Sequence, residues 1–453
     1  MIFAHALLPA GIARNVALEV AADGTLARVA NDVTPAGEPV VPGLVVPGMP
    51  NLHSHAFQRA MAGTAETLGK AESSFWGWRQ IMYGFVDRLE LEDVAAIAAW
   101  VYAEMLESGY TAVAEFHYLH RRPNGSAYAD PAAMATVLRQ AAAEVGIRQL
   151  MLPSLYQHAD FGGASPLPAQ RRFVQSTGAF LQLFDSLRAT DGGLLRTGIA
   201  LHSLRAVGPE ALREIGAYRA RVAPEVPVHI HVAEQRREVE DCLAWSGRRP
   251  IAYLLETGLV DRHWCLVHAT HSTPEELAGM ARAGAVVGLC PSTECNLGDG
   301  LFALDEFLQL GGEFGIGSDS QVCIDPRDEL RTAEYLLRIA RERRTVTASV
   351  AAPHCGEHLY AKAQGGGARA LGQGNGGLIA GAPADLLVID VDRPEWAGVP
   401  PAALLDAYLF APRPGAIRDV MVGGRWVVRN GEHVHRDRLG AAYRACLARL
   451  RGT

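Results

Sequence analysis

The chain has 453 residues, of which 49% are hydrophobic and 20% charged, and these values exclude a disordered, collagen-like or coiled-coil protein. A formal net charge of −7 argues against a nucleic-acid coat protein or a polybasic membrane tether, so we expect neither a nucleic-acid nor a membrane partner. The length fits one large catalytic unit or two domains that share a chain.

The amino-terminal residues 1–9 have neither the cationic start nor the long apolar stretch of a secretory signal peptide. No apolar run approaches the roughly 18 residues that a membrane-spanning helix needs. The seven cysteines include no CxxC pair, which argues against a disulfide framework or a zinc module built from thiolates. We therefore expect a cytoplasmic protein.

Eight short apolar runs, rich in β-branched residues, recur along the chain with helical stretches between them. They cover residues 44–49, 112–116, 149–155, 197–201, 226–232, 265–267, 286–289 and 314–317. Eight strands that alternate with helices over roughly 300 residues predict an α/β fold of the (β/α)8 barrel type, with a doubly wound sheet as the alternative. We expect this barrel to span residues 47–371.

The glycine-rich residues 365–367 and 372–377 predict a hinge at the end of the barrel. Beyond it, residues 384–390 and 419–428 have the pattern of strands, and residues 2–45 have a similar short β character. We expect the two ends of the chain, residues 1–46 and 372–453, to form one small β-sandwich domain from which the barrel is an insertion.

Histidine and acidic residues stand at the carboxyl ends of four predicted strands, where a barrel places its chemistry. They are His53 and His55 after strand one, His229, His231 and Glu234 at strand five, His268 at strand six and Asp319 at strand eight. Alternation along a strand places residues i and i+2 on one face, so both members of each His-x-His pair can face the barrel mouth. One such histidine is more often structural, but the ordered series predicts a site.

Several longer phrases carry a resemblance to a known family. Residues 46–55 (VPGMPNLHSH) and 317–320 (GSDS) resemble the amidohydrolase superfamily, whose composite β domain also matches the two ends of this chain. Within that superfamily, the sequence is similar to the N-formimino-L-glutamate deiminases of histidine degradation. The phrases that carry this similarity are 51–63 (NLHSHAFQRAMAG), 109–117 (GYTAVAEFH), 229–235 (HIHVAEQ), 245–250 (WSGRRP) and 266–271 (LVHATH).

The resemblance implies one divalent metal ion per chain, with zinc favoured and Fe²⁺ compatible with the same ligands. The implied ligands are His53, His55, His231 and Asp319. Relatives with two ions bridge them through a carboxylated lysine, and the only lysine between His55 and His231 is Lys70, just after strand one. We therefore expect a single ion, and Glu115 alone keeps a bridging alternative open.

The resemblance also implies the catalytic residues. Asp319 would take a proton from the attacking water, Glu234 would protonate the substrate nitrogen, and His268 would orient the water. Attack on a C=N carbon, followed by loss of ammonia, is the reaction class that these roles serve.

The substrate-binding residues implied by the resemblance are Gln58, Arg79, Tyr118, His202 and Arg205. Arginine suits a substrate with two carboxylates, because its planar fork stays charged and binds a carboxylate with two hydrogen bonds. Arg79 belongs to residues 75–79 (FWGWR), a segment long enough to cover the barrel mouth. Whether Trp76 and Trp78 contact the ligand or pack in such a cover is left open.

We expect His229 to pack beside its neighbours or orient them, since the implied ligand is the second histidine of its pair. Three residues depart from the family pattern: Gln321 stands where a histidine is expected, and Cys290 and Cys295 interrupt the phrase after strand seven. None of them is an implied ligand. The departures therefore concern the packing of these loops.

The favoured function is hydrolysis of N-formimino-L-glutamate to N-formyl-L-glutamate and ammonia, by a homodimer. A deaminase of a purine, pterin or related ring is the enzymatic alternative. Such an enzyme needs aromatic stacking and amide donors, whereas the implied pocket offers two arginines. A non-catalytic scaffold is the other alternative, but it has no need to keep the implied ligands together with Glu234 and His268.

Overall fold

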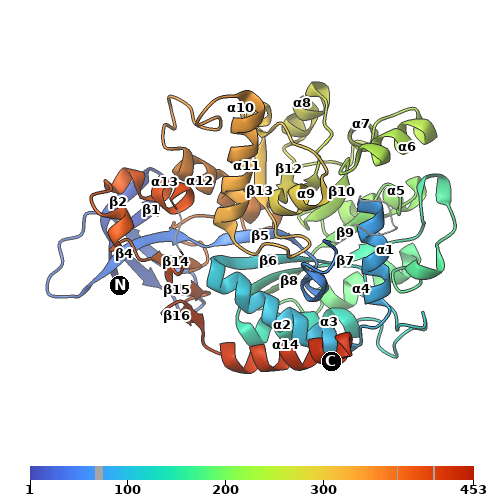
Figure 1. The fold of residues 1–453 in the computed structure, drawn as a ribbon, viewed down its shortest axis with the longest axis horizontal. Helices are drawn as coiled ribbons and strands as arrows, with labels where there is room; N and C mark the ends of the chain where they lie inside the picture. The colour runs from blue at the N-terminus through green and yellow to red at the C-terminus, as the bar shows by residue number, and fades with distance from the viewer. Residues whose placement is uncertain (67–74, 375, 412–413, 453) are drawn as a thin grey trace.

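The computed structural model describes residues 1–66, 75–374, 376–411 and 414–452. Figure 1 shows a large barrel with helices around it, and beside it a smaller sheet in which the blue amino-terminal and red carboxyl-terminal strands lie together. Among the described residues, no helix has the length and apolar character needed to cross a bilayer.

The barrel is closed by eight parallel strands in a ring. Neighbouring strands pair in parallel throughout, and the ring closes where Ile316 of the last strand pairs with Asn51 of the first. A short additional strand, β8 (Leu195–Thr197), pairs beside β7. The ring consists of β5 (Met49–Ser54), β6 (Tyr110–His117), β7 (Arg148–Leu155), β9 (Ile199–Ser203), β10 (Val228–Val232), β11 (Trp264–His268), β12 (Val286–Leu289) and β13 (Glu313–Ile316). This confirms the predicted (β/α)8 barrel.

The first barrel strand lies later in the chain than the predicted 44–49, so that range was wrong. Residues 44–47 belong to β4 (Val40–Pro47) of the small sheet, where Leu44 pairs with Ile389 in antiparallel register. The barrel strand begins only at Met49, after Gly48. A side chain at Gly48 would collide with Thr111, at 2.0 Å. The apolar run is continuous because its first half is buried in the small sheet and its second half in the barrel. The sequence pattern therefore does not show where one sheet ends and the other begins.

Both ends of the chain form the small sheet, which is mixed and continuous. Its order is β17 (Glu432–His433), β16 (Arg425–Arg429), β15 (Ile417–Val422), β14 (Leu386–Ile389), β4, β1 (Ile2–Leu8), β2 (Gly11–Val20) and β3 (Leu26–Ala30). The sheet curls so that the turn between β2 and β3 meets the residues that lead into β14, where the Ala384 amide donates to the Gly24 carbonyl at 2.9 Å. Phe3, Leu18 and Leu386 are buried in the core inside this curl. The sandwich is therefore one curled sheet, and the domain limits 46/47 and 371/372 stay a prediction.

The glycines at 365–367 do not form a hinge, because they lie inside helix α12 (Cys355–Ala370). A side chain at Gly366 would lie 2.0 Å from the carbonyl oxygen of Phe314, and one at Gly367 would lie 3.1 Å from Pro50. The missing side chains let α12 lie directly against β13 and β5. Glycine spacing alone did not distinguish close helix packing from a flexible segment.

Helices cover the outside of the barrel and connect its strands (Figure 1). Proline stands at the first position of five of them, where a missing amide hydrogen costs nothing. The helices are α1 (Phe75–Val86), α2 (Leu91–Ser108), α3 (Ala133–Val145), α4 (Thr177–Arg188), α5 (Pro209–Val222), α6 (Arg236–Ser246), α7 (Pro250–Glu256), α8 (Pro274–Ala283), α9 (Pro291–Leu297), α10 (Leu304–Gln309), α11 (Pro326–Arg341), α12, α13 (Leu404–Phe410) and α14 (Arg436–Arg451).

Candidate active site

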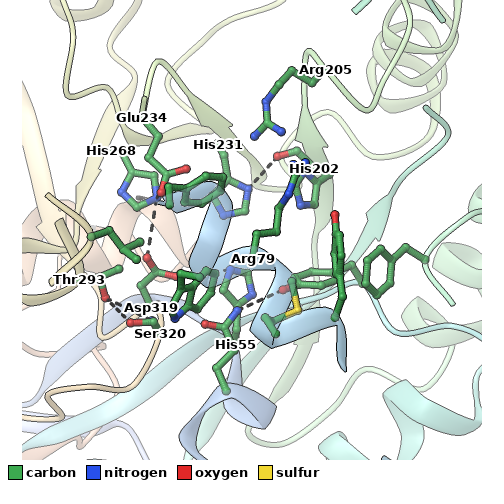
Figure 2. Close-up of a pocket in the computed structure, with 18 of the residues that line it drawn as sticks. His55, Arg79, His202, Arg205, His231, Glu234, His268, Thr293, Asp319 and Ser320 are labelled. Carbon is green, nitrogen blue, oxygen red and sulfur yellow. Dashed lines mark hydrogen bonds and ion pairs between the residues drawn. The ribbon is translucent and has the colours of Figure 1, made fainter. Parts of the chain in front are cut away.

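A cavity opens at the carboxyl ends of the barrel strands. Most of the residues that the sequence singled out line it: His55, Gln58, Arg79, Tyr118, His202, Arg205, His231, Glu234, His268 and Asp319. His53 is fully buried, with its ring centroid 4.6 Å from that of His55 and 4.7 Å from that of His231. The barrel thus brings together residues from the carboxyl ends of β5, β6, β9, β10, β11 and β13 and from α1, and Figure 2 shows several of them around one space.

Three histidines and one aspartate converge at one side of this cavity. Asp319 Oδ1 lies 3.5 Å from His53 Nε2 and 3.4 Å from His55 Nε2. His231 Nε2 lies 3.0 Å from His53 Nε2. Imidazole nitrogens and a carboxylate oxygen this close together form the donor set that proteins offer to a divalent transition metal.

The outer nitrogens of two of these rings are fixed by backbone carbonyls. Nδ1 of His55 donates to the Phe116 carbonyl at 2.7 Å, and Nδ1 of His231 donates to the His202 carbonyl at 2.7 Å. With its hydrogen on Nδ1, each neutral ring presents a bare Nε2 lone pair to the centre. The 3.0 Å approach of His231 to His53 then needs a shared proton or a shared cation, so the residues present fit a metal ion.

The electrostatics of this cluster favour neutral histidines beside an ionised aspartate. Burial lowers the pKa of His53 to about 3, and burial also lowers the pKa of His55 and His231. Burial raises the pKa of Asp319, but the hydrogen bond from His53 and the nearby imidazoles hold it well below its usual value. Neutral imidazole and ionised carboxylate are the forms that bind metal.

A second group of side chains, centred on His268, lies beside the first. His268 Nε2 is 3.8 Å from Asp319 Oδ2 and 3.9 Å from Glu234 Oε1, so the imidazole stands between two carboxylates. Its Nδ1 donates to Glu294 Oε1 at 3.2 Å. Burial lowers the pKa of His268, but Glu234, the hydrogen bond to Glu294 and Asp319 together raise it to about 10. Burial raises the pKa of Glu234 to about 7, a value suited to proton transfer near neutral pH.

The backbone at these strand ends is strained. The left-handed conformation is rare outside glycine, and where it persists it often marks a functional site. Here it is adopted by Ala233 (φ 52°), His268 (φ 68°), Ala269 (φ 51°), Asp319 (φ 43°) and Gln321 (φ 63°). These left-handed residues cluster beside the histidine–aspartate group and the His268 group. This clustering indicates that the fold forces the side chains of both groups into the cavity.

Gln321, one of the three departures from the family pattern, helps to hold the strained turn that carries Asp319. Its amide donates to Ser54 Oγ at 2.9 Å and to the Asp319 carbonyl at 3.0 Å, and its carbonyl oxygen accepts from Ser318 Oγ at 2.8 Å. The glutamine thus ties the turn that carries Asp319 to the end of the first barrel strand. Cys290 is buried and Cys295 is exposed, and neither lines the cavity.

Two arginines occupy the other side of the cavity, across from Asp319 (Figure 2). Arg79 comes from α1, and Arg205 follows β9 and is 4% exposed. Among the described residues, neither guanidinium forms an ion pair, and the Nε atom of each is buried without a hydrogen-bond partner. Leaving such groups without a partner is costly, so this side of the cavity suits an anionic ligand. Beside it, Gln58 Nε2 donates to Tyr118 Oη at 3.1 Å.

Sequence reasoning missed several residues of the cavity. Among the described residues, six aromatic side chains line the cavity, whereas the sequence implied Tyr118 and left Trp78 open: Phe75, Trp78, Tyr83, Tyr118, Tyr156 and Phe173. Tyr156 directly follows β7, and Glu294 follows β12 by five residues. Reading the ends of strands three and seven, as was done for the other strands, would have found both.

Two of the other predicted residues, His229 and Glu115, have different surroundings. His229 Nε2 donates to the Ala370 carbonyl at 2.9 Å, which fits the packing role expected of it. The Glu115 oxygens accept from the Ala56 amide and from Ser54 Oγ, each at 2.8 Å, and Glu115 is not among the converging donor groups of the described residues. Lys70 lies outside the described residues.

Comparisons with known proteins agree with this geometry. The model of the amidohydrolase family matches residues 40–427. Formimidoylglutamate deiminase of Pseudomonas aeruginosa is 50% identical over 451 residues, which cover 99% of each chain. A crystal structure of an amidohydrolase from Brucella melitensis superposes with a TM-score of 0.93 at 43% identity, and the match covers 99% of each chain.

A more distant relative is a deaminase. The 5-methylthioadenosine/S-adenosylhomocysteine deaminase of Natronomonas pharaonis is 30% identical over 393 residues, covering 86% of this chain and 82% of that protein. The difference in identity and coverage favours the deiminase over the ring deaminase as the model for this chain.

Proposed function

The chain belongs to the amidohydrolase family, and we propose that it hydrolyses N-formimino-L-glutamate to N-formyl-L-glutamate and ammonia. The observation that carries the proposal is the pair of guanidiniums, Arg79 and Arg205, that face the cavity without an ion-pair partner among the described residues. A substrate with two carboxylates supplies both partners at once. A neutral purine or pterin supplies neither, although the aromatic walls would stack on it.

His53, His55, His231 and Asp319 are the residues that would hold the metal ion, with zinc as the proposed metal. When bound, a divalent ion supplies Lewis acidity that brings the pKa of water from 15.7 to about 7. The rest of the chemistry belongs to side chains of this chain.

Two of these side chains move protons, and a third orients the attacking water. Asp319 Oδ2 takes a proton from the attacking water, and His268 Nε2, 3.8 Å away, holds the water in line with the C=N carbon. Attack forms a C–O bond and makes the carbon tetrahedral. Glu234 Oε1 gives its proton to the terminal nitrogen, and the proton that Asp319 took from the water then passes to the same nitrogen. The C–N bond breaks to release NH3, and the hydroxyl proton passes to the Glu234 carboxylate as the formyl C=O forms, so both carboxyls return to their starting states. One water is consumed and one ammonia is released.

Ammonia release from N-formimino-L-glutamate tests the proposal directly. The assay uses protein of measured metal content, with guanine and cytosine as control substrates. We expect turnover of the formimino compound alone. Release from a ring substrate and none from the formimino compound would contradict the proposal in favour of the ring deaminase. A homodimer and a cytoplasmic location stay predictions of the sequence.

Removal of the metal provides a second test. Treatment with a strong chelator, followed by dialysis, is expected to abolish ammonia release, and one equivalent of Zn²⁺ is expected to restore it. The melting temperature should fall in the stripped protein, because a bound ion stabilises the folded state by mass action. Full activity in protein shown to be metal-free would rule out the proposed use of the histidine cluster.

Arg205→Ala tests the carboxylate side of the cavity. Loss of a charged double hydrogen bond is expected to raise KM roughly 100-fold, while kcat changes far less, because Arg205 and Asp319 lie across the cavity from each other. Arg221→Ala is the matched control, since Arg221 is an exposed arginine on α5. An unchanged KM in Arg205→Ala would exclude Arg205 from substrate binding.

A further inference from the structure

Trp76, in the first turn of α1, is surrounded by three guanidinium groups from three elements of the fold. The Cζ atoms of Arg79, Arg237 and Arg205 lie 4.4, 4.8 and 5.5 Å from the centroid of its ring. Arg79 belongs to α1, Arg205 follows β9, and Arg237 lies in the first turn of α6. Trp76 does not line the cavity, whereas Trp78 does. Its ring therefore contacts the arginines and not the space that a ligand fills.

Three cations this close together repel one another, and carboxylates balance them unevenly. Burial lowers the pKa of Arg205, but Glu238 and other nearby acidic groups raise it above its usual value. Arg237 lies 3.5 Å from Asp241, but Arg79 and Arg205 form no ion pair. Burial lowers the pKa of Arg79, and the neighbouring Arg205 lowers it further. The electron-rich face of an indole attracts cations, and tryptophan does so more strongly than any other side chain. Trp76 is the aromatic residue that contacts all three guanidiniums.

We propose that Trp76 is the positioning residue of the carboxylate-binding side of the cavity, holding Arg79 and Arg205 at fixed places before the substrate arrives. This inference rests on the proposed function, because it takes the ligand to be a dicarboxylate. It also separates the two tryptophans of the segment: Trp78 is part of the cavity wall, and Trp76 supports the arginines behind that wall.

The proposed role predicts an effect on binding and not on the chemical step. Arg205 and Asp319 lie on opposite sides of the cavity, so a displaced guanidinium weakens the grip on the substrate without moving the reacting groups (Figure 2). Fixed arginines also reduce the ordering that binding requires, which favours affinity. A merely structural tryptophan would instead lower stability and leave KM alone.

The first test compares Trp76→Leu and Trp76→Phe with Trp100→Leu. Trp100 is a matched control: it lies on α2 with Arg436 Cζ 5.4 Å from its ring, and it does not line the cavity. We expect Trp76→Leu to raise KM for N-formimino-L-glutamate about tenfold with kcat within about twofold, and Trp76→Phe to restore most of the affinity. Trp100→Leu should keep the wild-type KM.

The second test uses the fluorescence of the tryptophan itself, with N-formyl-L-glutamate as the ligand. Carboxylates that bind the two arginines change the surroundings of the indole, so the fluorescence of the wild-type protein should change on titration. Because Trp78 lines the cavity and would also respond to the ligand, the titration uses Trp78→Phe as its background. In that background, Trp76→Phe should lose most of the remaining change, and Trp100→Leu should retain it.

The outcomes distinguish this inference from the function on which it rests. A wild-type KM in Trp76→Leu, or a fall in kcat alone, would overturn the role of Trp76 while the deiminase proposal stands. A wild-type protein that neither hydrolyses the formimino compound nor binds its product would overturn the proposed function and the inference together.

Discussion

Asp319→Asn is expected to reduce kcat for ammonia release by about 10³-fold or more. Asparagine has the shape of aspartate, but its amide cannot take a proton from water and carries no negative charge for a metal ion. The native carboxyl is well prepared for both tasks, since the hydrogen bond from His53 and the nearby imidazoles keep it ionised although it is buried.

The measurement should combine steady-state kinetics with metal analysis and a melting curve. If the folded variant keeps its metal and loses turnover, Asp319 acts as the proton acceptor. If the variant loses its metal, the main role of Asp319 is that of a metal ligand. Asp32→Asn is the control. Asp32 follows β3 of the small sheet and does not line the cavity, and its φ of 54° suits asparagine. Activity within tenfold of wild type in Asp319→Asn would contradict the mechanism.

The barrel and its histidine cluster were predictable because each rests on a local pattern. Short apolar runs rich in β-branched residues mark strands, and the residues that follow a barrel strand face the mouth of the barrel. His231 and Asp319 were found in this way, and the structure places both in the cavity. Predicting that the histidines lie together required no knowledge of long-range packing, because closure of the barrel brings all strand ends to one mouth.

The rest depended on contacts between segments distant in the chain. Phe173 and Tyr83 come from outside the strand ends, so no position in a strand pattern marks them as cavity residues. The glycines of α12 looked like a flexible segment because their requirement comes from Phe314 and Pro50, which pack against them from β13 and β5. Trp76 could not be separated from Trp78, since only the folded chain brings three arginines to one ring and not to the other.

Glu238 shows how the fold prepares a side chain that the sequence identified only by position. This buried carboxylate on α6 accepts from the amide of Ala233 at 3.3 Å and from that of Glu234 at 3.2 Å. Ala233 has a left-handed backbone, so the turn needs these hydrogen bonds to persist. The turn leaves the Glu234 carboxyl in the cavity, beside His268.

Glu234→Gln is expected to lower kcat by about 10²- to 10⁴-fold with little change in KM. Burial raises the pKa of Glu234 to about 7, so the carboxyl can carry a proton at neutral pH and give it to the leaving nitrogen. Glutamine keeps the volume of the side chain and can donate a hydrogen bond, but it cannot release a proton. Without that proton the nitrogen would have to leave as an amide ion, which is a much poorer leaving group than ammonia.

The matched control is Glu240→Gln, which makes the same substitution at an exposed position of α6, the helix that begins two residues after Glu234. Single-turnover measurement of N-formyl-L-glutamate and ammonia locates the defect, because a missing proton donor slows C–N cleavage and leaves substrate binding intact. A raised KM with normal kcat would instead assign Glu234 to substrate binding. Proton delivery would then have to come from the other titratable group within reach, His268, whose Nε2 lies 3.9 Å from Glu234 Oε1.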